Sequence, residues 1–545
     1  MNNKNVNKLF LVAIFLIGLF LRFYNLSEVP AGLHGDAASQ GYNAFSILKT
    51  GMDRYGESFP ILFRSLGSYQ PPLYTYLTTI SVLIFGNTVF AARFISALSG
   101  SLLILVTYFF VNSFSNKKNN LETISLFAAG LVSISPWAIF FSRLTVEANL
   151  GLLLFVTGLF LFSKSRFNIK FLPLACLVLG LSTHAYYSER LISIIFIPAF
   201  LYFFKDVFWK KEKTKWIAVS LIIFIFTLIP HIFTVFTGAF SRRFDQVASL
   251  GGFSIFEFVR KYLDYFLPKN LFFELPEGRL IPKIGPFYLW MIIPLLVSVF
   301  GYFKGKIELN LSKILLLLAF LTSVPAALTG DFFYPLRALE FLWIISIVIS
   351  VGLGIIYAST EYKYKFAILI ILCVVALVSL KSFYTSYFFL FRYGTDKNYG
   401  YSYVKLVEKL SEYSDKKIII DSARDTGIGV RLAYLLRYDP NKMQEMLKSQ
   451  MKSPYYSGTV NTDEVYKLDN IEVRPMVWGK DVYIEEIIVG DLLAISQSQV
   501  DEHKLKLEFE IPSADGAVYL RGYSTNPEEK CLSPSHGSVY CDKAP

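Results

Sequence analysis

One short stretch of the chain, LHGDAASQG at residues 33–41, holds a single carboxylate, Asp36, among small residues. It follows closely on the first long apolar run, which ends near Leu21. A carboxylate in such a place can accept a proton from an attacking hydroxyl group. It can also cap the helix expected over AASQGYNAFSIL, a position that Asp favours. The spacing alone leaves both interpretations open.

Three arginines stand at turns between later apolar runs. They are Arg143 in SPWAIFFSRLTVEANL, Arg190 in THAYYSERL and Arg337 in GDFFYPLRALEF. The planar guanidinium donates two hydrogen bonds to two phosphate oxygens, and in a water-poor site it stabilises charge on a leaving phosphate. A carboxylate with such arginines suffices for displacement at a sugar carbon, with a lipid phosphate leaving and an acceptor hydroxyl entering.

These charged side chains also have structural interpretations. Glu147 could bind the acceptor or a divalent cation, or it could pair with Arg143 at i, i+4. Arg190 could bind a phosphate or pair with Glu189. Arg337 could instead anchor its helix at the membrane surface. Ionisable groups next to membrane spans are functional candidates by default, so all of these positions are retained.

Two further residues accompany the candidate groups. Tyr187 precedes Arg190 closely and could stack on a sugar face. His34 is expected to be a loop or interface residue, because no second His, Cys or carboxylate around it has the spacing of a metal ligand. The chain has 5 scattered histidines, and we predict no metal site from them.

The elements that must position these groups are membrane helices. The chain of 545 residues is 54% hydrophobic and 17% charged, against about 25% charged residues in soluble domains. Long apolar runs recur up to about residue 390, which predicts about eleven spans of about 20 residues each. The formal charge of +11 does not indicate nucleic acid, because the basic residues lie between the runs. The fold class predicted is a multi-pass α-helical membrane protein.

The basic residues predict an orientation. Lys4 and Lys8 precede the first run, which lacks a small-residue cleavage site and is expected to be a retained helix. Alternate loops are basic, as the positive-inside rule requires, and they comprise 115–120, 163–170, 205–215, 304–306 and 361–365. The amino terminus is therefore expected in the cytoplasm, with the other loops and the tail outside.

The domain organisation predicted is a membrane module over 1–391, with outer loops at 22–90 and 238–285, and an outer domain over 392–545. In the tail, DKKIIIDSARDTGIGVRLAYLLRYDPNK is typical of a strand, a turn and a helix, and YIEEIIVGDLLAIS and HKLKLEFEIP are typical of strands. This predicts a small α/β or α+β domain. Cys531 and Cys541 either form a disulfide, as an oxidising compartment would favour, or remain two free thiols.

The candidate residues fall in stretches that resemble a known family. GLHGDAASQGYNAFSILKTGMDRYGESFPILF, YQPPLYTYLTTISVLIFG and FAARFISALSGSLLILVTYFF resemble the first outer loop and second span of GT-C glycosyltransferases. The branch they are most similar to is family 39, which contains the protein O-mannosyltransferases and the aminoarabinose transferases. The resemblance covers roughly residues 8–345. It implies a polyprenyl-phosphate-linked sugar donor and a catalytic acid in the first outer loop, here Asp36.

The chain departs from that family pattern at three positions. Many members have an acidic pair in the first loop, whereas Ala37 follows Asp36 here. Many have a lysine before the PPLY prolines, where this chain has Gln70 as the candidate substrate contact. A histidine often precedes the late arginine, and Tyr334 stands in that region. The missing lysine shifts the expected phosphate contacts to Arg190 and Arg337, and the missing second acid leaves open an inactive member.

The sequence thus predicts a glycosyltransferase of the cell envelope in the plasma (inner) membrane. It would move a sugar, with inversion, from a polyprenyl-phosphate donor to a hydroxyl on a lipid, glycan or protein acceptor at the outer face. No cofactor is predicted, and a divalent cation is left open. The alternative is a transporter or flippase of lipid-linked glycans, which should show internal repeats and helices broken at mid-membrane. We find no such repeat, and the charged residues lie at the ends of spans.

Overall fold

The computed structural model describes residues 3–115, 121–248, 254–305, 308–394, 399–533 and 541, and these residues form two compact units. The membrane unit comprises Met1–Leu26, Pro71–Tyr74 and Arg93–Leu390, and the loop–tail unit comprises Ser27–Gln70, Thr75–Ala92 and Phe391–Pro545. The change of unit between Leu390 and Phe391 lies one residue from the expected boundary at 391/392, but most of the first loop groups with the tail instead of with the membrane module. Most of the basic segment expected at 115–120, and residue 306 of the segment 304–306, lie outside the described residues.

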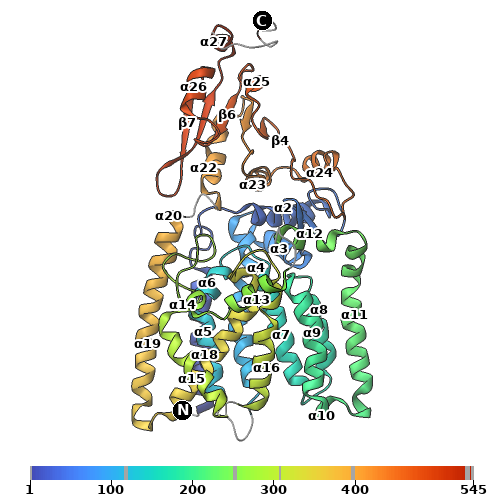
Figure 1. The fold of residues 1–545 in the computed structure, drawn as a ribbon. Helices are drawn as coiled ribbons and strands as arrows, with labels where there is room; N and C mark the ends of the chain where they lie inside the picture. The colour runs from blue at the N-terminus through green and yellow to red at the C-terminus, as the bar shows by residue number, and fades with distance from the viewer. Residues whose placement is uncertain are drawn as a thin grey trace. The chain divides into compact units, whose positions relative to one another are not determined.

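The membrane unit is a bundle of long helices that run side by side (Figure 1). Its longer helices are α1 (Asn3–Phe23), α4 (Val89–Asn112), α5 (Glu122–Ile134), α7 (Ala148–Ser165), α8 (Phe171–Ser182), α9 (Ser188–Phe203), α11 (Thr214–Phe236), α15 (Ile292–Phe303), α16 (Leu309–Leu321), α18 (Leu339–Ser359) and α19 (Tyr362–Tyr384). The short helices α6 (Pro136–Ser142), α10 (Lys205–Phe208) and α17 (Val324–Ala327) connect them. The first four residues of α4 belong to the loop–tail unit.

The number of membrane spans falls short of the expected eleven. Among the described residues, seven helices are long and apolar enough to cross a bilayer, and an eighth is gained if α5 and α6, bent by 55°, count as one span. Three further apolar helices, such as α8 with 12 residues, are shorter. A helix of 12 residues rises about 18 Å, less than the hydrocarbon core of about 30 Å. The structure therefore does not confirm the count.

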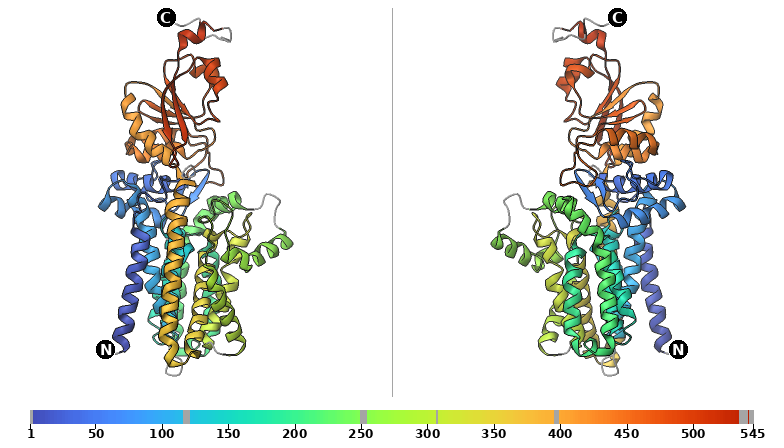
Figure 2. Two further views of the ribbon diagram at one scale, coloured as in Figure 1. Left: turned by 90° about the vertical axis from the view of Figure 1, so that its left-hand side faces the viewer. Right: turned by 90° about the vertical axis from the view of Figure 1, so that its right-hand side faces the viewer.

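The second outer loop expected, 238–285, contains three short helices. They are α12 (Ala239–Val247), α13 (Ile255–Asp264) and α14 (Pro268–Phe272). Ser254 caps α13 by accepting from the backbone N–H of Glu257, as serine commonly does. Figure 2 shows α13 lying across the direction of the long helices.

The loop–tail unit is built on a mixed sheet. Six strands in the order β4-β5-β3-β6-β8-β7 form it, with β3 parallel to both neighbours and the other pairs antiparallel. The strands are β3 (Ile418–Ile420), β4 (Tyr466–Leu468), β5 (Ile471–Val473), β6 (Ile487–Gly490), β7 (Lys506–Pro512) and β8 (Val518–Ser524). The three tail segments expected to be strands contain β3, β6 and β7, which confirms them.

Helices of the tail cover this sheet. They are α22 (Tyr401–Leu410), α23 (Ile428–Leu435), α24 (Pro440–Ser449), α25 (Trp478–Asp481), α26 (Gln497–His503) and α27 (Pro527–Cys531). The helix expected after the first tail strand is α23. Cys531 and Cys541 form a disulfide, so the first of the two cysteine alternatives is confirmed.

The first loop adds its own elements to the same unit. They are α2 (Gly35–Thr50), the hairpin strands β1 (Phe63–Ser65) and β2 (Ser68–Gln70), and most of α3 (Pro72–Phe85), whose first three residues belong to the membrane unit. Proline is favoured in the first turn of a helix because its missing N–H would be unpaired there. Gly51 ends α2 in the left-handed region, with φ of 76°, where glycine carries no steric penalty. One apolar core joins α2, α22 and α23 to the sheet.

Candidate active site

A cavity of about 430 Å³ lies in the membrane unit where several chain turns meet. The charged residues that line it are three arginines and one glutamate, so positive charge is in excess. Four of the eight sequence-predicted site residues line this cavity. They are Glu147, Tyr187, Arg190 and Arg337.

Arg190 is the most constrained of the cationic groups. It lies in the first turn of α9, and only 6% of the residue is exposed. Its guanidinium packs between the rings of Tyr187 and Phe240, at 4.4 and 4.8 Å from their centroids, and Nε donates to the carbonyl oxygen of Thr183 at 3.3 Å. Its Nη2 is buried and has no hydrogen-bond partner within the described part of the chain. Such a buried donor is costly unless a ligand oxygen satisfies it.

Arg337 is already partly neutralised by its own segment. Its Nη1 donates to Thr329 Oγ1 and to Asp331 Oδ2, both at 2.8 Å, and the guanidinium lies 4.6 Å from the ring centroid of Tyr334. Arg337 is thus held by an ion pair and a hydroxyl close to the cavity, and it is more than a membrane-surface anchor.

Sequence reasoning missed a third arginine of the cavity. Arg243, from α12, lines it together with Phe240 and Phe244. The sequence predicts only a long outer loop, 238–285, for this segment. The alternation of aromatic and basic residues in FSRRF was a signal of an amphipathic helix that turns one face toward the bundle.

Tyr186 lies between the charged groups of the cavity. Burial raises the pKa of its phenol well above the usual value, and the negative charge of Glu147 raises this pKa further, while Arg337 opposes the shift. The phenol therefore stays protonated and can donate a hydrogen bond. The residue lies between α8 and α9, in the turn AYYSERL.

A buried carboxyl pair stands behind the cavity. Glu189 in α9 and Glu340 in α18 are both inaccessible to solvent, and the hydroxyl of Ser188 lies at 2.8 and 3.0 Å from one oxygen of each. The pair connects the first turn of α9, which carries Arg190, to the first turn of α18, which follows Arg337. We interpret this contact as one that fixes the position of the first turn of α9, and with it Arg190.

Arg143 lies elsewhere in the membrane unit and does not line the cavity. Its Nη1 donates to the carbonyl oxygens of Leu21 and Arg22 at 2.9 and 3.1 Å, and its Nη2 donates to that of Asn25 at 3.2 Å. The last carbonyls of a helix have no intrahelical partner and attract cations. Arg143 thus satisfies the carboxyl end of α1, which indicates a structural role.

Asp36 and His34 belong to the loop–tail unit. Asp36 is the second residue of α2, and its side chain is 44% exposed. The N-cap is His34, whose Nδ1 accepts from the backbone N–H of Asp36 at 3.3 Å. The alternative that Asp36 caps this helix is therefore wrong: the helix begins two residues earlier than expected, at Gly35 instead of Ala37. In the first turn, its negative charge also interacts favourably with the helix dipole.

Gln70 contacts Asp36 directly. Its amide Nε2 donates to the carbonyl oxygen of Asp36 at 3.1 Å and to Oδ1 at 3.4 Å. Gln70 ends strand β2 and is almost fully buried. At the position where the family that this stretch resembles often has a lysine, Gln70 thus donates hydrogen bonds to Asp36.

The tail holds the start of α2 in place. The guanidinium of Arg431, on α23, donates to the carbonyl oxygen of Leu33 at 2.9 Å and pairs with Asp425 at 3.1 Å. A methyl group on Gly41 would lie 2.7 Å from Cε2 of Tyr434, so only glycine lets the two helices approach this closely. Residues about 400 positions apart thereby share one helix contact.

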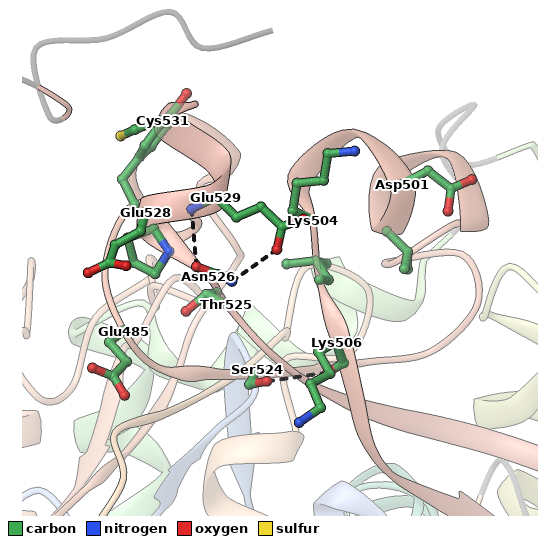
Figure 3. Close-up of a pocket in the computed structure, with 14 residues that line it drawn as sticks. Glu485, Asp501, Lys504, Lys506, Ser524, Thr525, Asn526, Glu528, Glu529 and Cys531 are labelled. Atoms are coloured by element: carbon green, nitrogen blue, oxygen red, sulfur yellow. Dashed lines mark hydrogen bonds between the residues drawn. The ribbon is translucent and has the colours of Figure 1, made fainter. Parts of the chain in front are cut away.

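A larger hollow of about 1000 Å³ lies in the tail itself (Figure 3). Exposed charges of both signs line it, including Glu485, Asp501 and Lys504. Asn526 accepts from the backbone N–H of Glu529 at 3.1 Å and donates to its Oε2 at 3.0 Å, which is the cap of α27. None of the described residues that line this hollow has a buried polar side-chain atom without a partner, unlike Arg190, so we do not take it as the candidate active site.

Within the described ranges, no group of three or more His, Cys, Asp and Glu side chains is arranged to hold a metal ion. Glu147 has three cavity arginines as neighbours rather than further carboxylates. This lining suits an anionic ligand, because a phosphate can accept hydrogen bonds from several guanidinium groups.

A family model described as dolichyl-phosphate-mannose-protein mannosyltransferase matches residues 69–233. That stretch contains Gln70, Glu147, Tyr187 and Arg190. Among curated protein sequences, no significant match was found.

Solved structures show the same fold. The structure of ArnT from Cupriavidus metallidurans in the apo state matches with a TM-score of 0.53 at 13% identity, over 96% of this chain and 98% of that one. ArnT of the same organism bound to undecaprenyl phosphate matches with a TM-score of 0.52 at 12% identity, over 94% and 97%. The archaeal oligosaccharyltransferase AglB from Archaeoglobus fulgidus, in complex with an inhibitory peptide and a dolichol-phosphate, matches at a TM-score of 0.48 and 14% identity, over 79% and 64%.

At these identities, the two ArnT matches, with TM-scores of 0.53 and 0.52, establish the fold alone. The two ArnT structures are covered almost completely, so the fold is shared over both the helical bundle and the sheet-containing tail. The chain thus has the fold of these membrane proteins, and its residues 69–233 are similar to the family described as dolichyl-phosphate-mannose-protein mannosyltransferase.

Proposed function

We propose that this protein transfers a sugar from a polyprenyl-phosphate donor to a hydroxyl acceptor at the outer face of the membrane, with inversion. The observation that carries the proposal is the unsatisfied Nη2 of Arg190 in a cavity lined by two further arginines. A phosphate oxygen supplies the missing acceptor, and the aliphatic and aromatic lining suits the lipid that follows it.

The cavity residues act on the leaving phosphate. Arg190 and Arg243 bind its oxygens, and Arg337 adds a guanidinium whose charge Asp331 partly balances. Negative charge on the phosphate grows as the bond to the sugar breaks. Fixed cationic groups in a water-poor site stabilise that charge more than they stabilise the ground state.

Asp36 acts on the acceptor. Its carboxylate accepts the proton of the acceptor hydroxyl. The acceptor oxygen bonds to the anomeric carbon as the bond between that carbon and the phosphate oxygen breaks. A single displacement of this kind inverts the anomeric centre, as in glycosidases that place their two groups on opposite faces of the ring. The basic segments between spans support a cytoplasmic amino terminus and an outward-facing tail.

The test is transfer by the purified full-length chain. A panel of polyprenyl-phosphate sugars, each with one radiolabelled hexose or pentose, is offered with a membrane extract as acceptor. We expect label in the extract with at least one donor, and a loss of at least about a thousandfold for Asp36→Asn. Equal turnover by the wild type and Asp36→Asn, or no transfer with any donor, would reject the proposal.

Two controls define the result. Asp36→Asn should insert into membranes and unfold at nearly the wild-type temperature, because the amide keeps the size of the carboxyl group. A parallel assay with EDTA asks whether a divalent cation takes part. Label that crosses a vesicle membrane while still attached to its carrier would favour the flippase instead.

A further inference from the structure

A chain of hydrogen bonds within the loop–tail unit ends at Asp36. Arg54 Nη1 donates to Ser39 Oγ at 2.8 Å, Ser39 Oγ donates to Gln70 Oε1 at 3.2 Å, and Gln70 Nε2 donates to Asp36. Ser39 follows Asp36 by three residues, so the two share one face of α2. Arg54 and Ser39 are fully buried.

The donor-to-acceptor direction of these hydrogen bonds is determined by Arg54. Arginine has only donors, so Arg54 occupies one lone pair of the Ser39 oxygen. The hydroxyl of Ser65 donates to the other at 2.9 Å. The single proton of Ser39 is left for Gln70 Oε1. The opposite amide orientation would offer a third donor to two lone pairs and would turn a carbonyl oxygen toward the Asp36 carboxylate.

The anchor of Arg54 is firm. Its Nη2 donates to the carbonyl oxygen of Arg64 at 3.1 Å. The residues on either side of it are bound to the tail: the hydroxyl of Tyr455 donates to Asp53 at 2.6 Å, and that of Tyr55 donates to Glu464 at 2.7 Å. Burial raises the pKa of Asp53, and its hydrogen bonds oppose that shift.

We propose that Ser39, Gln70 and Arg54 form a positioning relay, in which Arg54 orients the Gln70 amide so that it donates to Asp36. This inference rests on the proposed function and deepens it, because it replaces the expected substrate-binding role of Gln70. The relay holds one carboxylate oxygen, Oδ1. The other, Oδ2, lies 4.0 Å from Nδ1 of His34, beyond hydrogen-bond distance, and is left for the acceptor hydroxyl.

The decisive comparison uses two serines of one helix. Ser39→Ala removes the relay, whereas Ser46→Ala removes an equally buried hydroxyl of α2 that donates to the carbonyl oxygen of Met52 and accepts from Gln444. In the transfer assay, Ser39→Ala should lower kcat about tenfold with an unchanged donor KM, and Ser46→Ala should leave both within about twofold. Their unfolding temperatures should agree within about 2 °C.

The second comparison tests the direction of the amide. Gln70→Glu replaces the donor by an acceptor that faces Asp36, and we expect kcat to fall at least about a hundredfold. Gln70→Lys keeps a donor and should retain at least about ten times more kcat than Gln70→Glu. A substrate-binding role of Gln70 would instead raise the donor KM in both variants.

The outcomes separate this inference from the proposed function. If Asp36→Asn is inactive but Ser39→Ala behaves as Ser46→Ala, the relay is wrong and the catalytic role of Asp36 stands. If Gln70→Glu is as active as the wild type, the amide is not oriented toward the carboxylate and the relay is again rejected. If Asp36→Asn is active, the proposed function itself fails.

Discussion

The arginine cavity and the start of α2 are each stabilised by a different kind of contact. Arg337 is bound by Thr329, Asp331 and Tyr334, all within eight residues of it. The start of α2 is bound by Arg431, 398 residues from the Leu33 carbonyl that it holds. Arg337 of the cavity is thus fixed by its own local segment, whereas the start of α2, with the candidate catalytic carboxylate, is held by a distant part of the chain.

The largest effect in this comparison is expected at Arg190. Arg190→Met removes the buried donor and keeps much of the aliphatic volume. We expect the donor KM to rise about a hundredfold, which corresponds to about 2.7 kcal/mol, because the phosphate loses a charge-assisted hydrogen bond. Donor titrations of the wild type and the variant measure it, and Arg260→Met on α13 is the control. An unchanged KM would remove the phosphate from this cavity.

The contact between α2 and α23 can be broken with one methyl group. Gly41→Ala places that group against the ring of Tyr434, and we expect unfolding to become easier by about 2 kcal/mol and kcat to fall about tenfold. Thermal unfolding and transfer measure the two effects.

The matched control for that change is Gly130→Ala in α5. A methyl group there meets no atom within 4 Å, and alanine is the better helix former, so this variant should be as stable as the wild type or slightly more so. Equal behaviour of the two glycine variants would show that the close approach of α2 to α23 does not matter.

A smaller effect is expected at Arg337. Because Asp331 already balances much of its charge, Arg337→Met should raise the donor KM only about fivefold to tenfold. If its effect exceeds that of Arg190→Met in the same titration, the ranking drawn from the unsatisfied Nη2 is wrong.

The smallest effect is expected at the carboxyl terminus. Replacing Cys531 and Cys541 by serine removes a disulfide that closes a short loop, which lowers local stability by about 2–3 kcal/mol. Transfer should stay within about twofold of the wild type, because neither residue contacts the groups that act on substrate. A large loss of kcat would mean that this end of the chain takes part in acceptor binding.

Most of the candidate site residues could be picked out from the sequence, but few of the contacts that position them could. Asp36, Arg190 and Arg337 stand out because charge beside an apolar run is rare and costly. Arg243 was missed because its segment was expected only to be part of a long outer loop. Arg143 has the same pattern as the cavity arginines, and only coordinates show that its guanidinium serves the end of α1.

The fold was predictable to a similar extent. Apolar runs indicate a helical bundle and alternating residues indicate the tail strands, but the count of about eleven spans is not confirmed, because apolar helices such as α8 are shorter than the membrane is thick. The pairing of residues 27–70 with the tail was not predictable from one sequence. The sequence around Gly41 does not indicate a contact with Tyr434, because the fit between two distant segments exists only in the folded chain.

The shared core of α2 and the tail has a consequence for biosynthesis. A ribosome emits the Asp36 segment early and strands β7 and β8, which complete the sheet, only near the end. Until residues 403–520 have followed, Leu33 and Tyr42 lack the full apolar core that buries them. The helices of a nascent chain can therefore enter the bilayer long before its first loop acquires a fixed shape.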